Sequence, residues 1–476
     1  MITKVIISTM LTVAAVFLSD PCLGEDAAEP AVVGTNRAGT NIAEWTVMVF
    51  MNAKNNLEPC AFHNFRQMSS IGGTDSVHIV VEFGRPNRHY YHYSPPDSTG
   101  TGDWSKTLRF FVKKDTQPLE RDATQDLGKI DMGSGANLAE FVQWAYKEYP
   151  AKKHMLIIWD HGQGWRLADA ITLRNASGTG WAFVSFRKAL FNLQVAKGRP
   201  IKEPVLPTSE VVHGIVRYVS NDEDTGNKMY NRDIQDSLKS RGVKLDVIGY
   251  DACLMSMIET AYGMREIARV LVASQELEPG NGWDYEDVLE RLEKNPKMDA
   301  KDLGNALVQS YQQSYQGAED TTLSAIDLEA VPKLADAVHQ WSVYANDHLS
   351  NQLAWIQGAR TNCYSYAPDY GMPYVDMGAF LDKYADSITD VRAVQLTQSA
   401  RQLLRSCVLS NYAAPSRQGK YGSNGLSIYF PQSALAFTND ADHDGYLLAN
   451  TYFPVEFVNN IAWAKFLYGY FQGTPR

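Results

Sequence analysis

The sequence predicts an α/β protein in which a mostly parallel sheet is flanked by helices. Short apolar runs of strand length recur at 45–51, 77–83, 155–159, 245–248 and 270–274. Stretches with apolar residues at helical spacing separate these runs. Strands that alternate with helices are typical of β-α-β units, in which consecutive strands run parallel and the helices cover the sheet.

The helix expected at 137–149 has one apolar face and leads directly into the strand at 155–159. Asparagine residues at 55 and 56 open another expected helix, which runs to Met68. The remaining elements that we expect are strands at 108–112, 322–328 and 426–430 and helices at 230–241, 302–315, 331–348 and 455–470.

No clean linker divides the chain, so domain boundaries are set by the pattern of elements. We expect an α/β core at 44–300 and a C-terminal α/β region at 301–476 that packs on this core. Inside the core, residues 166–230 are rich in glycine, proline and scattered basic residues and are predicted to be an insertion.

The N-terminal residues predict export. Residues 1–24 contain Lys4, an apolar stretch of signal-peptide length and small residues around Cys22, which is the pattern of a cleaved secretory signal. A lipid anchor on Cys22 is the weaker alternative, and 25–43 is expected to be a flexible linker or tail. We therefore expect a periplasmic, cell-surface or secreted protein without a membrane span.

Charge and cysteine content exclude other classes. The 44 Lys and Arg residues against 54 Asp and Glu residues give a net charge of −10 without a basic block, so nucleic acid is not an expected partner. Four cysteines remain after signal removal, which is too few for a disulfide scaffold. Two of Cys60, Cys363 and Cys407 could form a disulfide with each other, and Cys253 would then remain a free thiol.

Cys253 lies where a strand is expected to turn into a helix. The apolar run at 245–248 is closed by Gly249, and the residues from Met255 to Tyr262 recur at helical spacing. A thiol at the carboxyl end of a strand and the amino end of a helix is favoured as thiolate. The alternative is that Cys253 is a small buried apolar residue.

A second strand end lies upstream, where the run 155–159 breaks at Asp160, His161 and Gly162. His161 and Cys253 are 253 − 161 = 92 residues apart. If the two strands are neighbours in one parallel sheet, the imidazole and the thiol meet at the same edge. Gly162 and Gly164 would let the backbone approach a substrate closely.

Several blocks of the sequence together resemble the clostripain family of cysteine peptidases, whose fold is related to those of caspases and gingipains. They occur in the order of the family at 45–58, 157–165, 248–262, 272–285, 322–328 and 425–431. The resemblance implies a caspase-haemoglobinase-like sheet, a His161/Cys253 dyad and cleavage after Arg or Lys. It also implies activation by a cut within 166–243. Relatives usually carry an acidic residue where this chain has Lys54.

The residue types suit thiol-based peptide hydrolysis. Cys253 supplies the nucleophile, and His161 moves the proton because an imidazole titrates near neutral pH. The backbone N–H groups of Gly162 and Cys253 are the expected oxyanion donors. Asp160 is expected to be structural, because adjacent strand residues point to opposite faces.

Asp251 projects to the same side as Cys253 and is the expected contact for a basic substrate residue. Glu276 and Asp284, on the following loop, are further expected substrate contacts, and Glu278 adds negative potential there. The alternative for Asp251 is that it caps a helix beginning near Leu254.

No cofactor is expected for the chemistry, and the other histidines lack the spacing of a zinc site. Acidic residues at 439–444 are expected to form a solvated turn, with a calcium site as the alternative, since calcium stimulates some relatives. We therefore expect an exported monomeric cysteine endopeptidase that acts on proteins or peptides, with two chains if it is processed. The alternative is an inactive family member that binds protein or glycan at the surface.

Overall fold

The computed structural model describes residues 42–87, 102–164, 219–439 and 456–473. The predicted signal at 1–24, nearly all of the predicted linker at 25–43, most of the predicted insertion and residues 440–444 of the acidic segment lie outside these ranges. From residue 42 onward the chain forms a single compact unit. The regions predicted at 44–300 and 301–476 therefore belong to one body.

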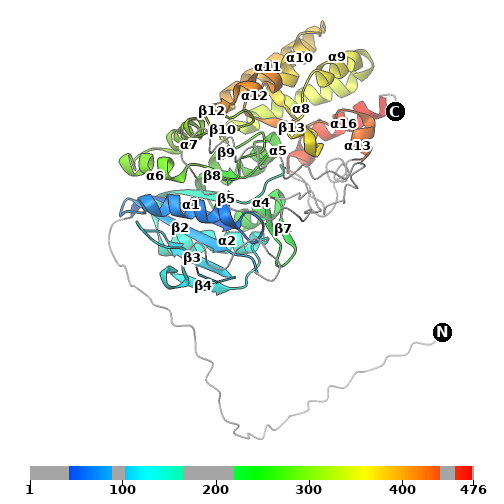
Figure 1. Ribbon diagram of the computed structural model, residues 1–476. Coiled ribbons are helices and arrows are strands. Elements are labelled where there is room, and N and C mark those ends of the chain that lie inside the picture. The colour runs from blue at the N-terminus through cyan, green and yellow to red at the C-terminus, as the bar shows by residue number, and fades with distance from the viewer. Residues whose placement is uncertain (1–41, 88–101, 165–218, 440–455, 474–476) are drawn as a thin grey trace, which may run out of the picture. The chain divides into compact units, whose positions relative to one another are not determined.

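Nine strands form the central sheet in the order β12-β10-β9-β8-β5-β1-β2-β3-β4 (Figure 1). The five central strands from β9 to β2 are parallel, and the strands outside them pair antiparallel. This arrangement confirms the predicted mostly parallel α/β fold. The strands are β1 (Ala43–Asn52), β2 (Val77–Gly84), β3 (Thr107–Phe111), β4 (Gln125–Gly128), β5 (Ala151–Trp159), β8 (Leu245–Asp251), β9 (Ala268–Ala273), β10 (Thr322–Asp327) and β12 (Val408–Ala413).

Both faces of the sheet are covered, which explains why the central strands are apolar along their whole length. Along β1, Val47 and Val49 face one apolar cluster, whereas Met48 and Phe50 face the other. The first cluster also contains side chains of α1 (Glu58–Ile71), α6 (Tyr285–Lys294) and α7 (Ala300–Ser314). The second contains side chains of α2 (Gly135–Glu148), α4 (Asn231–Ser240), α5 (Ile258–Met264) and α8 (Val331–Asp347).

The C-terminal part of the chain completes the same sheet, because β10 and β12 extend it beyond β9. A short antiparallel pair of β11 (Tyr374–Asp376) and β13 (Ser427–Tyr429) lies among its helices. Those helices are α9 (Leu349–Thr361), α10 (Met377–Ala385), α11 (Val391–Cys407), α12 (Pro415–Tyr421), α13 (Ala434–Asn439), α15 (Glu456–Asn460) and α16 (Trp463–Gly473). The predicted helix at 455–470 is thus two helices.

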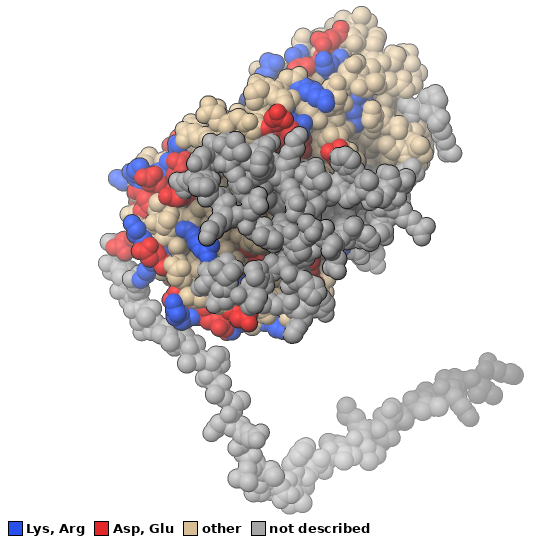
Figure 2. Space-filling view, in the orientation of Figure 1, with Lys and Arg blue, Asp and Glu red and all other residues tan. Residues whose placement is uncertain are grey.

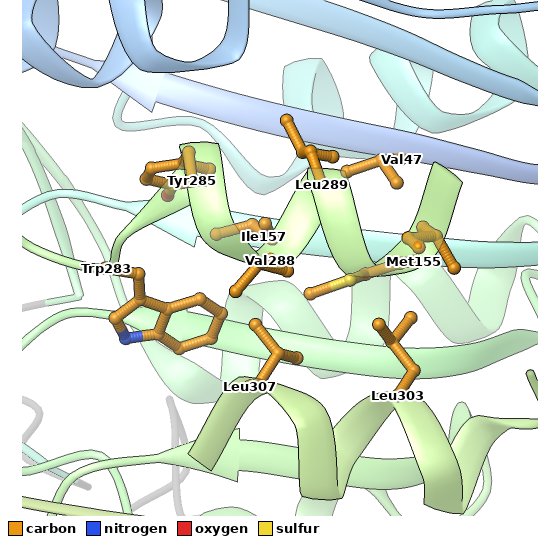
Figure 3. A pocket seen from close by; sticks show the side chains of 10 residues that line it. Val47, Met155, Ile157, Trp283, Tyr285, Val288, Leu289, Leu303 and Leu307 are labelled. Atoms are coloured by element: carbon orange, nitrogen blue, oxygen red, sulfur yellow. The ribbon is translucent and has the colours of Figure 1, made fainter. Parts of the chain in front are cut away.

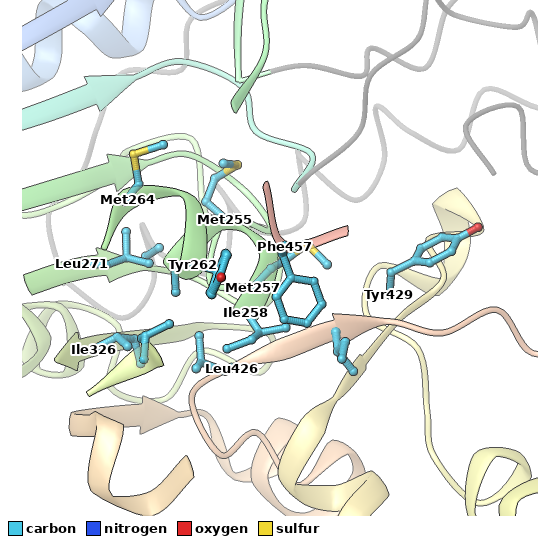
Figure 4. Close-up of a cluster of buried hydrophobic side chains, with 14 of the residues drawn as sticks. Met255, Met257, Ile258, Tyr262, Met264, Leu271, Ile326, Leu426, Tyr429 and Phe457 are labelled. Carbon is cyan, nitrogen blue, oxygen red and sulfur yellow. The ribbon is translucent and has the colours of Figure 1, made fainter. Parts of the chain in front are cut away.

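The chain that follows Cys253 is held by a dense apolar cluster around α5 (Figure 4). Met255, Met257 and Ile258 are fully buried there, together with Leu271 of β9 and Ile326 of β10. Leu426, Tyr429 and Phe457, from the C-terminal part, are buried in the same cluster. The turn that carries the thiol is therefore supported by residues from distant parts of the sequence.

All four cysteines within the described residues are free, so no pair among Cys60, Cys363 and Cys407 forms a disulfide. No helix in the described ranges has both the length and the apolar character that crossing a membrane requires.

Lys54 is buried beside the carboxyl edge of the sheet. Its ammonium group lies 3.0 Å from Asp222 Oδ2, in the hairpin of β6 (Ser220–Asp222) and β7 (Asn227–Met229), and it also donates to the Ile130 carbonyl. Both charged side chains are almost fully buried. The pair ties this hairpin to the end of β1, and an ammonium group at this position does not fit a bound metal ion.

Replacing Lys54 with alanine should leave Asp222 as a buried charge without its cation. We expect the free energy of unfolding to fall by about 3 to 5 kcal/mol, measured by denaturant titration. Lys294→Ala is the control, because Lys294 forms an exposed ion pair with Glu290 at 2.7 Å, and its loss should cost less than about 1 kcal/mol. Equal effects of the two substitutions would contradict this role for the buried pair.

Candidate active site

The register between β5 and β8 brings the two predicted chemical groups to one edge of the sheet. Trp159 pairs with Asp251 in these parallel strands, and His161 and Cys253 each follow two residues later. Gly162 lies against the backbone of Cys253, so closely that a Cβ atom on it would be 2.3 Å from the Cys253 carbonyl oxygen and 2.7 Å from the Cys253 nitrogen. Any larger residue at 162 would separate the two segments.

His161 is half-buried, and its ring is held by Asn56, in the loop between β1 and α1. Nε2 of His161 lies 2.7 Å from Asn56 Oδ1. With its proton on Nε2, the ring donates this hydrogen bond and keeps the lone pair on Nδ1 available as a base. Burial lowers the pKa of His161 to about 4, so the resting imidazole is neutral. Sequence reasoning missed Asn56, although it lies in the paired asparagines of the 45–58 block.

Asp160 accepts hydrogen bonds from four N–H groups, none of which belongs to the imidazole ring of His161. Its partners are the side chains of Asn52 (3.0 Å) and Asn55 (2.7 Å) and the backbone N–H groups of Asn221 (2.7 Å) and His161 (2.6 Å). Burial raises its pKa, which these donors oppose. The carboxyl group of Asp160 therefore joins the end of β1, the His161 loop and the start of β6.

Cys253 is not at a helix terminus, which corrects the prediction from the sequence. The helix α5 begins at Ile258, because Leu254 adopts a left-handed conformation (φ 64°) and the chain to Met257 is not helical. Burial raises the pKa of the Cys253 thiol to about 11, and the N–H of Glu278, 3.2 Å from Sγ, opposes this shift. The resting thiol is therefore protonated, without a helix dipole to favour the thiolate.

Asp251 is buried at the end of β8 and faces the loop that precedes α6. Its Oδ2 accepts from the Trp283 N–H at 3.2 Å and from the Tyr285 hydroxyl at 2.8 Å. The predicted alternative, a cap for a helix near Leu254, is wrong because no helix begins there. Burial raises the pKa of Asp251. The carboxyl group of Glu278 lies beside that of Asp251. Burial and the nearby Asp251 charge raise the pKa of Glu278 well above its ordinary value.

Glu276 and Asp284, the other two predicted substrate contacts, have carboxyl groups that make structural bonds. Glu276 accepts from the backbone N–H groups of Leu277 and Ala367 and lies 3.0 Å from Arg417 Nε. Asp284 caps the start of α6 and accepts from the Ser314 hydroxyl at 2.8 Å. A contact of either residue with substrate stays a prediction.

An apolar cavity of about 10 Å³ lies behind this loop, between α6, α7 and the sheet (Figure 3). It is lined by Trp283, Tyr285 and leucines of both helices and has room for about one water molecule, so it is a packing void. On the face shown in Figure 2, the described acidic and basic side chains are interspersed. Among the described residues, no group of three or more His, Cys, Asp or Glu side chains could hold a metal ion.

A thiol and an imidazole on the carboxyl edge of a mostly parallel sheet define a candidate cysteine peptidase with a caspase-like fold. The sequence profile of the Clostripain family matches residues 49–190 and 209–468. The chain therefore belongs to the clostripain family and is a cysteine peptidase. It is 22% identical over 435 residues to clostripain of Hathewaya histolytica, a match that covers 81% of this chain and 74% of that protein.

Solved structures of the same peptidase family share the fold. A secreted cysteine protease from Bacteroides thetaiotaomicron, in complex with an irreversible peptide inhibitor, has a TM-score of 0.55 and 16% identity, and the match covers 87% of this chain and 98% of that one. An inactive zymogen protease from Parabacteroides distasonis has a TM-score of 0.52 and 16% identity, with coverage of 90% and 98%.

Asn56→Ala should remove the acceptor that holds His161 without removing the imidazole. We expect kcat to fall about 10-fold to 100-fold, a part of the roughly 10² to 10⁴ that a positioned general base supplies, with KM little changed. Asn56→Asp should restore part of this loss and move the acid limb of the pH–rate profile upward, because a carboxylate raises the pKa of His161. Asn362→Ala, at an exposed helix end, is the control. An Asp variant whose acid limb matched that of the wild type would contradict the contact.

Proposed function

We propose that the protein is an exported endopeptidase that uses Cys253 as nucleophile and His161 as general base and acid. The observation that carries the proposal is the contact of the His161–Gly162 segment with the backbone of Cys253 at the carboxyl edge of adjacent parallel strands. Membership of a cysteine peptidase family supports the same assignment.

In this mechanism the resting pair is a neutral thiol and a neutral imidazole, which follows from the raised pKa of Cys253 and the lowered pKa of His161. His161 takes the thiol proton as Sγ bonds to the scissile carbonyl carbon, and the imidazolium then protonates the departing amine as the C–N bond breaks. Water hydrolyses the resulting thioester. The N–H groups of Gly162 and Cys253 are the proposed donors to the oxyanion, where one donor typically lowers the barrier by roughly 3 kcal/mol.

The proposed substrates are proteins or peptides with Arg or Lys before the scissile bond. Asp251 supports this preference, because its carboxyl group is buried near Cys253 and forms no ion pair within the described residues. A guanidinium or ammonium group would supply the missing opposite charge. Glu276 and Asp284 stay predicted as further substrate contacts, although their carboxyl groups also have structural partners.

Maturation by a cut within 166–243 is part of the proposal. A zymogen among the similar structures supports processing in general. The candidate positions Arg174, Arg187, Lys188, Lys197 and Arg217 lie outside the described residues, whereas Lys228 lies in β7. Export through the 1–24 signal and a monomer of one or two chains complete the proposal. No cofactor takes part in the chemistry, and a calcium site at 439–444 stays the alternative to the predicted solvated turn.

Reporter peptides that end in Arg, Lys or Asp test this function directly. We expect thiol-dependent cleavage after Arg and Lys, loss of at least about 10³-fold in Cys253→Ala, and a loss of the basic preference in Asp251→Asn. Mass spectrometry of the intact chains identifies the processed form that is assayed. Absence of thiol-dependent turnover in every processed form would support the alternative of an inactive, binding family member. If the preference for Arg persists in Asp251→Asn, only the proposed contact of Asp251 with the basic substrate residue is wrong.

A further inference from the structure

Buried acidic side chains in this protein generally have strong partners. Glu58 and Glu82 lie 2.7 Å from Arg85 and Arg109, respectively. Asp376 accepts four hydrogen bonds, from Gln275, Ala379 and two N–H groups of Asn424, and Asp160 also has four donors. Such partners are expected, because a buried carboxylate without a cation or donors is unstable.

Glu278 departs from this pattern. Both of its carboxyl oxygens are shielded from solvent and accept no hydrogen bond of normal geometry from the described residues, although the indole N–H of Trp283 is close enough to lower the pKa of Glu278. Its closest charged neighbour is another acid, Asp251, and the two side chains can bond to each other only when one of them holds a proton. Among the described residues no Lys or Arg forms an ion pair with either carboxyl group. Two acids are thus buried together at a place that lacks a cation.

The pair lies directly beside the nucleophile. The backbone N–H of Glu278 points at Cys253 Sγ at 3.2 Å, and Asp251 is two residues before Cys253 on β8. Burial is the main cause of the raised pKa of the Cys253 thiol, and the negative charges of Glu276 and Asp251 add to it. The proximity of Cys253 likewise contributes to the raised pKa of Glu278. A thiolate at Cys253 and ionised carboxyl groups at Asp251 and Glu278 therefore oppose one another.

We propose that Glu278 and Asp251 together bind the guanidinium or ammonium group of the residue before the scissile bond, and that this cation offsets the buried negative charge beside Cys253, so that a basic substrate activates the thiol that cleaves it. This inference rests on the proposed function and deepens it. Glu278 becomes a second specificity-determining carboxylate, in addition to Asp251. The cation has two effects, since it provides binding energy and makes proton loss from Sγ easier.

The neighbours of the pair allow this role, because apart from the two acids they are neutral at ordinary pH. Tyr285 of α6, Tyr311 of α7 and Tyr315 directly after α7 face the carboxyl groups, and burial raises the pKa of each hydroxyl well above 10. Cys60 of α1 also faces Asp251, and burial raises its pKa to about 12. Glu276 is the other charged group near Cys253, and it is paired with Arg417.

The carboxyl groups of Asp251 and Glu278 determine how kcat/KM for a basic substrate should change with pH. Both have raised pKa values, so they are fully ionised only at a higher pH than ordinary carboxyl groups, and a cation binds best above that pH. The acid limb of kcat/KM should therefore lie at higher pH for a peptide that ends in Arg than for the same peptide ending in citrulline, its neutral analogue. Glu278→Gln should reduce this difference.

The specificity test compares wild type, Glu278→Gln and the control Glu286→Gln, whose exposed side chain lies on α6. We expect the ratio of kcat/KM for the Arg peptide over the citrulline peptide to fall at least about 10-fold in Glu278→Gln and to stay unchanged in Glu286→Gln. An unchanged ratio in a folded Glu278→Gln protein would contradict the role of Glu278 as a second specificity-determining carboxylate.

The activation test needs no peptide cleavage. The rate at which iodoacetamide alkylates Cys253 is followed against pH by peptide mapping, with and without n-butylguanidine. We expect the guanidine to lower the midpoint of this profile in wild type by about one pH unit, which is a tenfold change in ionisation, and to have little effect in Glu278→Gln. If n-butylguanidine does not change the midpoint in wild type, the proposed activation of the Cys253 thiol by a bound cation is wrong. A moved midpoint in a protein that cleaves no peptide would leave the inference standing and reject the proposed function.

Discussion

The parallel pairing of β5 with β8 is the constraint on which the active-site edge depends. Both strands are central and buried on both faces, so a slip of one residue would turn apolar side chains out of two cores and would also move His161 relative to Cys253. Gly162 lets the His161 segment lie directly against the backbone of Cys253, because the space at its α-carbon has room for a hydrogen atom but not for a Cβ atom. Backbone register and one glycine thus bring the His161 and Cys253 segments together.

Asp160 extends this constraint to the rest of the edge. Its carboxyl group binds the N–H of His161, the asparagines at the end of β1 and the N–H of Asn221. The β6–β7 hairpin is therefore bonded to the His161 loop, and the buried pair of Lys54 with Asp222 ties the same hairpin to the end of β1. These bonds would survive a cut upstream of 219, so a two-chain product would keep its base in place.

The sequence predicted the parts that follow from periodicity. Apolar runs with polar ends identified β5 and β8, and parallel topology then predicted that His161 and Cys253 share one edge. Loop contacts were not predictable in this way, because they depend on how loops fold back. Asn56 was missed, and Glu278 was expected only to add negative potential. The partner of Glu276 is Arg417, 141 positions later in the chain. The late start of α5 follows from the left-handed Leu254 and the packing of Met255 and Met257, which helical spacing alone does not show.

The electrostatics of the site give a reason why specificity and reactivity should be coupled in such a peptidase. In the free protein the thiol and the imidazole are neutral, and the negative charges of Glu276 and Asp251 make the thiolate still less favourable. A neutral substrate side chain beside these acids would not compensate their charge, so it would not make attack easier. A basic side chain does compensate them, and its effect is greatest when negative charge develops on sulfur. Discrimination then arises in the transition state, where it raises kcat as well as binding.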